Sequence, residues 1–313
     1  NFEVRLLPSI LYSRMAECSY LEGEYGEGLR YVRKAVDALE TSSHVRLYAG
    51  QLTDRYGFKS IADDYYDQAL ELCPTYTDAL VQKAQLRIEE QGKQPPEMRS
   101  FVRAEELFNK VLRISPDHLQ AKLSLANIAT RNEEYARARD LYLELLDRYP
   151  ESVLVTVNLA NLYTEMRDFG RAGELYERAL EIDPESSLAV LNLSTFLMNS
   201  GRVERAKEVL EEFLETFPGN AYAHYNLGLA FHNSGDYNDA ISHYKEAAEA
   251  APKMTHAWEN LVLTLSRADR LPETVDALAE MKKTGRPMLD KPSEGLRMPG
   301  VNGQDLVLLL CKD

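Results

Sequence analysis

Cysteine is scarce in this sequence, and its cysteines follow no pattern that would join them. Cys18, Cys73 and Cys311 are an odd number at unrelated positions, with no CxxC pair. This arrangement does not indicate a metal site or a redox motif, and a reducing compartment fits it best. We expect a cytoplasmic location. Because the sequence begins at Asn1, a signal peptide, an anchor or further domains upstream are left open.

Long hydrophobic runs and an excess of positive charge are also absent. Hydrophobic residues make up 44% of the chain but are dispersed, and no stretch approaches the roughly 18 to 20 consecutive apolar residues of a membrane span. The chain has 36 Lys and Arg against 50 Asp and Glu, and the resulting formal net charge of -14 opposes binding to phosphate backbones. We therefore expect no insertion into a membrane and no nucleic-acid partner.

The sequence also lacks the common motifs of catalysis. HExxH, GxSxG, Walker A and GxGxxG motifs are all missing. His224, His232, His243 and His256 lie close together in the sequence, but their spacing predicts different helix faces. We expect no catalytic residue, no cofactor and no metal site, and therefore no enzymatic activity in this chain.

What the sequence does contain is a repeat of 34 residues. Five prolines follow one another at this spacing: Pro116, Pro150, Pro184, Pro218 and Pro252. In the same frame an alanine recurs twelve residues before the proline, at Ala138, Ala172, Ala206 and Ala240. A period of this length indicates stacked helical repeats, and the alanines mark where two helices touch most closely.

The clearest unit, residues 221–254, shows the pattern of a known repeat. It carries Leu227, Gly228, Phe231, Gly235, Tyr237, Ala240, Tyr244, Ala247 and Pro252. This pattern resembles the tetratricopeptide repeat, a helix–turn–helix unit. The resemblance implies an all-α fold, a right-handed superhelical solenoid of about eight repeats. One unit cannot bury both of its apolar faces alone, whereas stacked units can.

The repeat frame assigns most of the chain. We place an N-terminal lead-in at 1–8, repeats at about 9–42, 43–76, 77–118, 119–152, 153–186, 187–220, 221–254 and 255–283, and a tail rich in proline and glycine at 284–313. Pro74 and Pro116 are 42 residues apart, and we assign the excess to an enlarged loop at 92–100, where Pro95 and Pro96 cannot continue a helix.

The resemblance also implies which side chains face a partner. In the family the first helix of each repeat lines a concave groove through its positions 2, 5, 6, 9 and 12. Carried over to the later repeats, these positions predict a partner-binding wall of Leu154, Val157, Asn158, Asn161, Leu188, Leu191, Asn192, Thr195, Tyr222, Tyr225, Asn226, Leu229 and Asn260. Such an apolar and amide-rich wall suits a peptide or a helix of another protein.

Asparagines recur along this wall at intervals of 34 residues, at Asn158, Asn192, Asn226 and Asn260. The middle repeats are similar in this to those of the O-linked N-acetylglucosamine transferase. Their carboxamides could form a ladder that hydrogen-bonds to the main chain of an extended peptide. Alternatively, each asparagine bonds only to the neighbouring helix. The sequence leaves both interpretations open.

The tail ends in an apolar stretch, residues 306–310, that is too short to cross a membrane. It could cap the last repeat, fill the groove or dock on another chain. We predict a scaffold or adaptor that binds a peptide or helix in the groove and supports assembly of a larger complex. Alternatively, the repeats are the substrate-recognition arm of a larger enzyme such as a glycosyltransferase. Self-association through the terminal repeats or the tail is left open.

Overall fold

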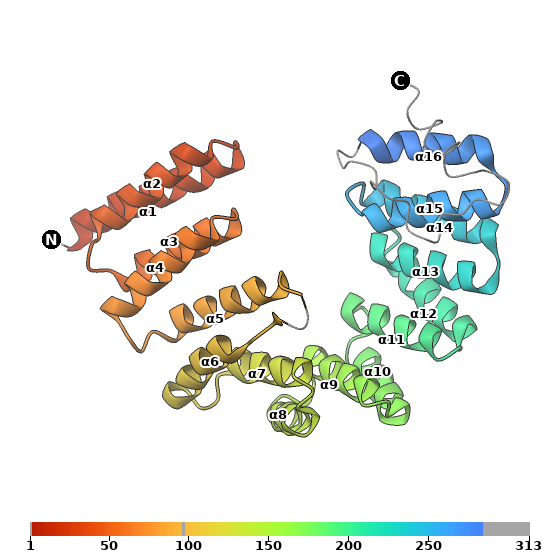
Figure 1. Ribbon diagram of the computed structural model, residues 1–313, viewed down its shortest axis with the longest axis horizontal. Coiled ribbons are helices and arrows are strands. Elements are labelled where there is room, and N and C mark those ends of the chain that lie inside the picture. Colours follow the sequence, from red (N-terminus) through yellow and green to blue (C-terminus); the bar gives the residue numbers. More distant parts are fainter. Residues whose placement is uncertain (1, 96–97, 284–313) are drawn as a thin grey trace. The chain divides into compact units, whose positions relative to one another are not determined.

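The computed structural model describes residues 2–95 and 98–283, which form sixteen α-helices and no strand (Figure 1). The tail at 284–313 and its three alternatives lie outside the described residues. The helices are α1 Phe2–Leu21, α2 Tyr25–Ala38, α3 Ser43–Arg55, α4 Lys59–Leu72, α5 Thr77–Gly92, α6 Val102–Ile114, α7 Leu119–Arg131, α8 Tyr135–Arg148, α9 Val153–Glu165, α10 Phe169–Ile182, α11 Ser187–Asn199, α12 Val203–Thr216, α13 Ala221–Ser234, α14 Tyr237–Ala250, α15 Thr255–Arg267 and α16 Leu271–Lys283.

The N-terminal helix and the connection between α5 and α6 differ from the simple repeat pattern. Helix α1 begins at Phe2 and contains Pro8, so residues 2–8, assigned to a lead-in before the first repeat, belong to the same helix as the start of that repeat. Between α5 and α6 the chain leaves the helical path, and the Ser100 amide donates a hydrogen bond to Oε1 of Gln91 at 2.9 Å.

Capping residues set where the first helix begins in three successive repeats. Ser152, Ser186 and Asn220 lie 34 residues apart, directly before α9, α11 and α13. Each side chain accepts a hydrogen bond from the backbone N–H three residues later. A serine or asparagine in this place satisfies an N–H group that has no partner within the helix. The caps therefore give these three repeats the same starting point.

The turn between the two helices of a repeat needs a left-handed backbone residue at its fifteenth position. Glycine occupies it in several repeats, with φ of 87° at Gly57, 75° at Gly201 and 84° at Gly235. Arg167 and Asp269 adopt the same conformation without being glycine, with φ of 60° and 58°. A side chain in this region costs about 1 kcal/mol, which the packing of the two helices must offset.

The alanines of the repeat lie where the helices meet. Ala138, Ala172, Ala206 and Ala240 are all fully buried, as is Ala62 in an earlier repeat. Large side chains fill the space around them, and Tyr66, Phe108, Tyr142 and Tyr244 are among the largest fully buried ones. The core is therefore a series of small clusters between neighbouring helices, as expected when each repeat packs only on its neighbours.

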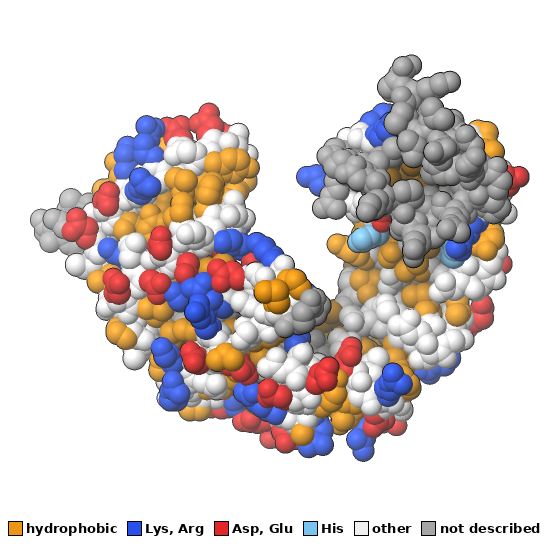
Figure 2. All heavy atoms as spheres, in the orientation of Figure 1, with side chains coloured by type: hydrophobic (Ala, Val, Ile, Leu, Met, Phe, Trp, Pro, Cys, Tyr) orange, Lys and Arg blue, Asp and Glu red, His pale blue; other side chains and the backbone are white. Residues whose placement is uncertain are grey.

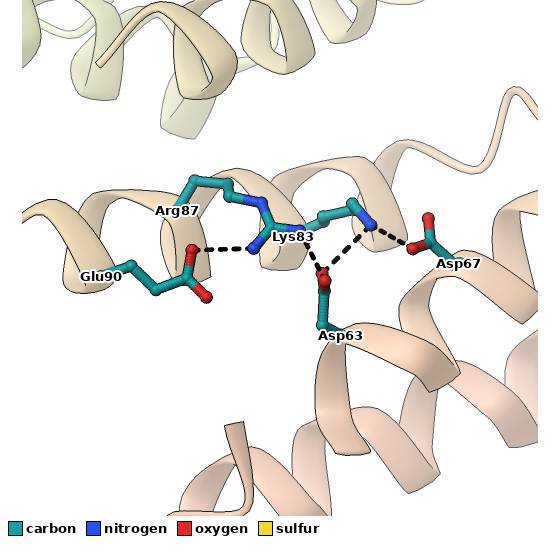
Figure 3. A network of polar contacts seen from close by, with 5 residues as sticks. All are labelled: Asp63, Asp67, Lys83, Arg87 and Glu90. Atoms are coloured by element: carbon teal, nitrogen blue, oxygen red, sulfur yellow. Dashed lines mark hydrogen bonds and ion pairs between the residues drawn. The ribbon is translucent and has the colours of Figure 1, made fainter. Parts of the chain in front are cut away.

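The chain divides into two compact units, residues 1–148 and 149–313. In the first unit, an ion-pair network joins the second helix of one repeat to the first helix of the next (Figure 3). Asp63 on α4 pairs with both Lys83, at 3.1 Å, and Arg87 on α5. Asp67 and Glu90 complete the network, and the cations are largely shielded from solvent.

Candidate functional site

The first helices of the second unit place a stripe of exposed and half-buried side chains on one face. Leu188, Asn192, Thr195 and Asn199 follow one another on α11 at steps of four, three and four residues. This spacing keeps them on one side of a helix. Since α9 contacts α11 and α11 contacts α13, the first helices form a continuous row.

Apolar side chains at the second position of each repeat are exposed on this row. Leu154 is 46% exposed, Leu188 38% and Tyr222 63%. Thr195 is also exposed, and the other predicted wall residues are half-buried, namely Asn158, Asn161, Leu191, Asn192, Tyr225, Asn226, Leu229 and Asn260. Large apolar side chains that stay in contact with water at equivalent positions mark a surface available to a partner.

One predicted wall residue does not reach the surface. Val157 is 0% exposed and packs in the core, so the family positions included one residue too many in this repeat. Its neighbours Val155 and Leu159 on α9 are equally buried. An apolar face this wide on α9 turns Val157 inward, which is a correction to the predicted wall.

The asparagine row does not form an open ladder in the structure. Nδ2 of Asn226 is 3.3 Å from Oγ of Ser194 on the preceding first helix, and Nδ2 of Asn260 donates to the Tyr225 hydroxyl at 3.0 Å. Nδ2 of Asn192 donates to the Leu188 carbonyl of its own helix at 2.8 Å. Three of the four carboxamides therefore donate hydrogen bonds within the protein, and two of these donate to the neighbouring first helix.

A hollow of about 370 Å³ opens between α9, α10 and α11. It brings together three predicted residues, Asn161, Asn192 and Thr195. It also contains Thr164, which the family positions place on the groove at position 12 of its repeat, and residues that they did not place there: Phe169, Tyr176, Phe196, Asn199 and Ser200. Phe169 and Asn199 are exposed and could have been found from the helical spacing alone, whereas Tyr176 reads as a core residue.

Hydrogen bonding leaves particular groups of the hollow free. The Tyr176 hydroxyl donates to Oδ1 of Asn161, and no described residue accepts a hydrogen bond from the Asn161 Nδ2 group. The carboxamide of Asn199 has no partner among the described residues either. Oδ1 of Asn192 is left to accept, because only its Nδ2 is engaged. An extended backbone needs such a mixture of donors and acceptors.

The lining of this hollow carries no charge. Three carboxamides and four hydroxyl groups share it with the aromatic rings of Phe169 and Phe196. Burial raises the pKa of Tyr176, while its hydrogen bond with Thr164 acts in the opposite direction, so the phenol stays neutral at physiological pH. The hollow can therefore hold an uncharged apolar or amide side chain better than a charged one.

Comparison with known families decides what kind of repeat this is. A tetratricopeptide repeat pattern matches residues 97–153 and 191–255, and a second tetratricopeptide repeat pattern matches residues 155–188. The chain is a solenoid of tetratricopeptide repeats. The finer likeness to the repeats of the O-linked N-acetylglucosamine transferase stays a prediction.

Solved structures of tetratricopeptide repeat proteins share this fold. Yeast Tom70 superimposes with a TM-score of 0.65 at 17% sequence identity, covering 90% of this chain and 58% of Tom70. A tetratricopeptide repeat protein from Parabacteroides merdae gives a TM-score of 0.63 at 16% identity and covers 83% of this chain and 99% of its own. At such identities the likeness shows the fold alone. A search of curated proteins finds no match.

Two of the histidines meet in the tetratricopeptide repeat at 221–254, contrary to the prediction that they lie on different faces. Nδ1 of His224 is 3.1 Å from Nδ1 of His243, and the two rings stack with centroids 5.4 Å apart. Their helices are the two halves of one repeat, which brings residues 19 positions apart together. No group of three or more His, Cys, Asp or Glu within residues 2–95 and 98–283 could hold a metal ion.

The N-terminal helices also carry exposed apolar side chains. Figure 2 shows hydrophobic side chains gathered over the N-terminal helices, where Leu7, Ile10 and Leu11 of α1 are exposed by 75%, 52% and 59%. None of the helices that the structure describes is both long and apolar enough to cross a membrane. The row of first helices in the second unit combines exposed apolar side chains with the hollow between α9, α10 and α11, and it is the candidate site for this reason.

Proposed function

We propose that this chain is an interaction module that holds an extended segment of a partner protein along the first helices α9, α11 and α13. The observation that carries the proposal is the uncharged hollow between α9, α10 and α11, on the same row of first helices as the exposed Leu154 and Leu188. A polar rim around apolar anchors is the usual composition of a peptide-binding surface.

Each part of the hollow has a role in this proposal. An uncharged side chain of the partner enters between Phe169 and Phe196. The free Nδ2 groups of Asn161 and Asn199 donate to main-chain carbonyls, and Oδ1 of Asn192 accepts a main-chain N–H. Because these contacts go to the peptide backbone, affinity comes mainly from the backbone and selectivity from the side chain that fills the hollow.

A matched pair of variants tests this assignment. Asn199 and Asn233 occupy the same position in successive repeats, and both are exposed, but only Asn199 lines the hollow. Peptides would be selected on the wild-type chain from a phage-displayed random library. We expect the selected peptides to bind Asn199→Glu about tenfold more weakly, since a carboxylate would have to be desolvated beside the ligand, and Asn233→Glu about as well as wild type.

Isothermal titration with the selected peptides gives the affinities. Equal binding to the wild type and both variants would show that recognition lies elsewhere on the chain. The same surface would serve if the repeats are the substrate-recognition arm of a larger enzyme, so these variants test the location of binding under either interpretation.

A further inference from the structure

A second groove, of about 450 Å³, lies between the second helices α10 and α12. It shares no lining residue with the hollow on the first helices. Its floor is apolar: Val209 and Phe213 are buried, whereas Leu180 and Phe217 are half-buried and stay in contact with solvent. The ring centroids of Phe213 and Phe217 are 4.8 Å apart, so the two rings form one apolar surface on this floor.

Carboxylates surround this apolar floor. Glu177 and Glu181 on α10 and Glu185 just after it form one side, and Glu212 on α12 lies on the other. Within the described part of the chain, no ion pair within 4.0 Å joins any of these four carboxylates to a cation. The carboxylate of Asp63, by contrast, pairs with Lys83 and Arg87 of the neighbouring helix α5.

The pKa of Arg205 reflects the negative charge around the groove. Arg205 lies at the groove and pairs with Glu208 at 3.0 Å. The pKa of its guanidinium is raised, first by the hydrogen bond with Glu208 and then by the charges of Glu177, Glu208 and Glu212, against the opposing effect of burial. The groove therefore has a negative potential that a single arginine does not cancel.

We propose that the groove between α10 and α12 is a second docking site, which takes a basic amphipathic segment of a partner protein. Apolar side chains of that segment cover Leu180 and Phe217, and its lysines or arginines pair with Glu177, Glu181 and Glu212. Charge complementarity selects this occupant: an acidic segment would be repelled, and a neutral one would leave the carboxylates partly desolvated without partners.

The assignment goes beyond the proposed function, because it places a separate ligand on the opposite helices of the same repeats. A chain with both sites could hold two segments at once, one neutral and extended, the other basic. The two sites can be examined independently, since Asn199→Glu changes only the first and the glutamates change only the second.

A designed peptide provides the probe. It is a fluorescein-labelled helix-forming peptide with leucines along one face and lysines on both flanks, and its analogue has serine at each leucine. Fluorescence anisotropy with the full chain at about 0.15 M salt limits long-range attraction between exposed charges. We expect the leucine peptide to bind at least about tenfold more tightly than the serine analogue, because only the former covers the apolar floor.

Two triple variants of identical net charge separate docking from general attraction to an acidic protein. Glu177→Gln with Glu181→Gln and Glu212→Gln removes charge from the groove, and Glu151→Gln with Glu165→Gln and Glu246→Gln removes charge from exposed positions outside it. We expect about a tenfold loss of affinity for the first triple and less than about twofold for the second. Equal losses, equal binding of the serine analogue, or no binding of the leucine peptide would each overturn the proposal.

Discussion

The hydroxyl group of Tyr176 donates a hydrogen bond to the side-chain oxygen of Asn161, fifteen residues earlier in the same repeat. Tyr142 makes the same bond to Asn127 one repeat earlier. Both tyrosines are buried at the twenty-fourth position of their repeats, and both asparagines occupy the ninth. A tyrosine that looks like an ordinary core residue therefore orients a polar side chain of the first helix.

Two other repeats have the tyrosine without the bond. The hydroxyl groups of Tyr66 and Tyr244 are buried with no hydrogen-bond partner in the described protein. Their rings lie directly on Gly50 and Gly228, where an added Cβ would come within 2.4 Å and 2.7 Å of the ring. The repeats that form the bond have alanine at this position: Ala126 and Ala160. The choice between glycine and alanine thus accompanies two different placements of the ring.

Removal of the tyrosine hydroxyl should therefore have different effects on stability in the two kinds of repeat. Tyr176→Phe breaks the bond to Asn161, and we expect a loss of about 1 kcal/mol in the free energy of unfolding. Tyr244→Phe removes a buried hydroxyl without a partner, and we expect no loss. Urea unfolding compares the two midpoints within the same unit. A similar loss in both variants would show that the hydrogen bond is not what matters.

Alanine should not be tolerated at Gly228. The new methyl group would meet Cδ1 of Tyr244 at 2.7 Å, and a fully buried ring has no room to move. We expect Gly228→Ala to lower the free energy of unfolding by about 1 to 3 kcal/mol. Gly170→Ala is the control, since its nearest contact is an ordinary 3.7 Å to Asp168, and we expect no loss there. Thermal unfolding of both variants measures the difference.

Stability of the second unit should fall as the solution becomes acidic. Burial, and next the nearby His224, lower the pKa of His243 below its usual 6.5 in the folded chain. The unfolded chain then binds more protons than the folded one, so this stability is complete above pH 6.5 and is lost as the pH falls from there to the folded pKa. We expect the urea midpoint to fall between about pH 7.5 and pH 5.5.

His243→Gln should reduce this pH dependence without abolishing it. His232 contributes in the same direction, because burial and then the charge of Arg267 lower its pKa as well. If the urea midpoint of His243→Gln falls with pH as steeply as that of the wild type, the pH dependence does not arise from the pair of His224 and His243.

Removal of the Asp63 carboxylate, which Lys83 and Arg87 share, should lower the stability of both α4 and α5. In Asp63→Ala, Lys83 and Arg87 both lose a partner although their side chains are only 13% and 19% exposed. We expect the opening free energy of α4 and α5 to fall by about 1 to 2 kcal/mol, more than for an exposed pair. Hydrogen exchange of the helix amides measures it. Lys245→Ala, in an exposed pair with Glu249, should have no measurable effect.

Much of the architecture was predictable because the same residue pattern recurs from repeat to repeat. The proline period predicted stacked helical pairs, and the family matches and the helices confirm tetratricopeptide repeats. The recurring alanines mark buried contacts, as Ala172 and Ala206 show. Such local signals suffice because each repeat packs only on its neighbours, so few distant contacts have to be inferred.

The details of the binding surface were harder to predict. Family positions placed Val157 on the wall, although the apolar width of α9 buries it. They also did not show whether the asparagines form an open ladder or bond to the neighbouring helix. The answer depends on whether Ser194 comes within hydrogen-bonding distance of Asn226, and Tyr225 within that of Asn260. Position in a repeat fixes the face of a helix but not the few ångströms that decide a hydrogen bond.

The sequence by itself determined the helices, their pairing and the row of first helices, since these follow from periodicity, caps and turn residues within one repeat. Only the tertiary structure decided where the row is hollowed, which amides are free, and that four glutamates surround an apolar floor between α10 and α12. These features arise between helices of different repeats, where the size and direction of each side chain, and not the repeat pattern, set what solvent can reach.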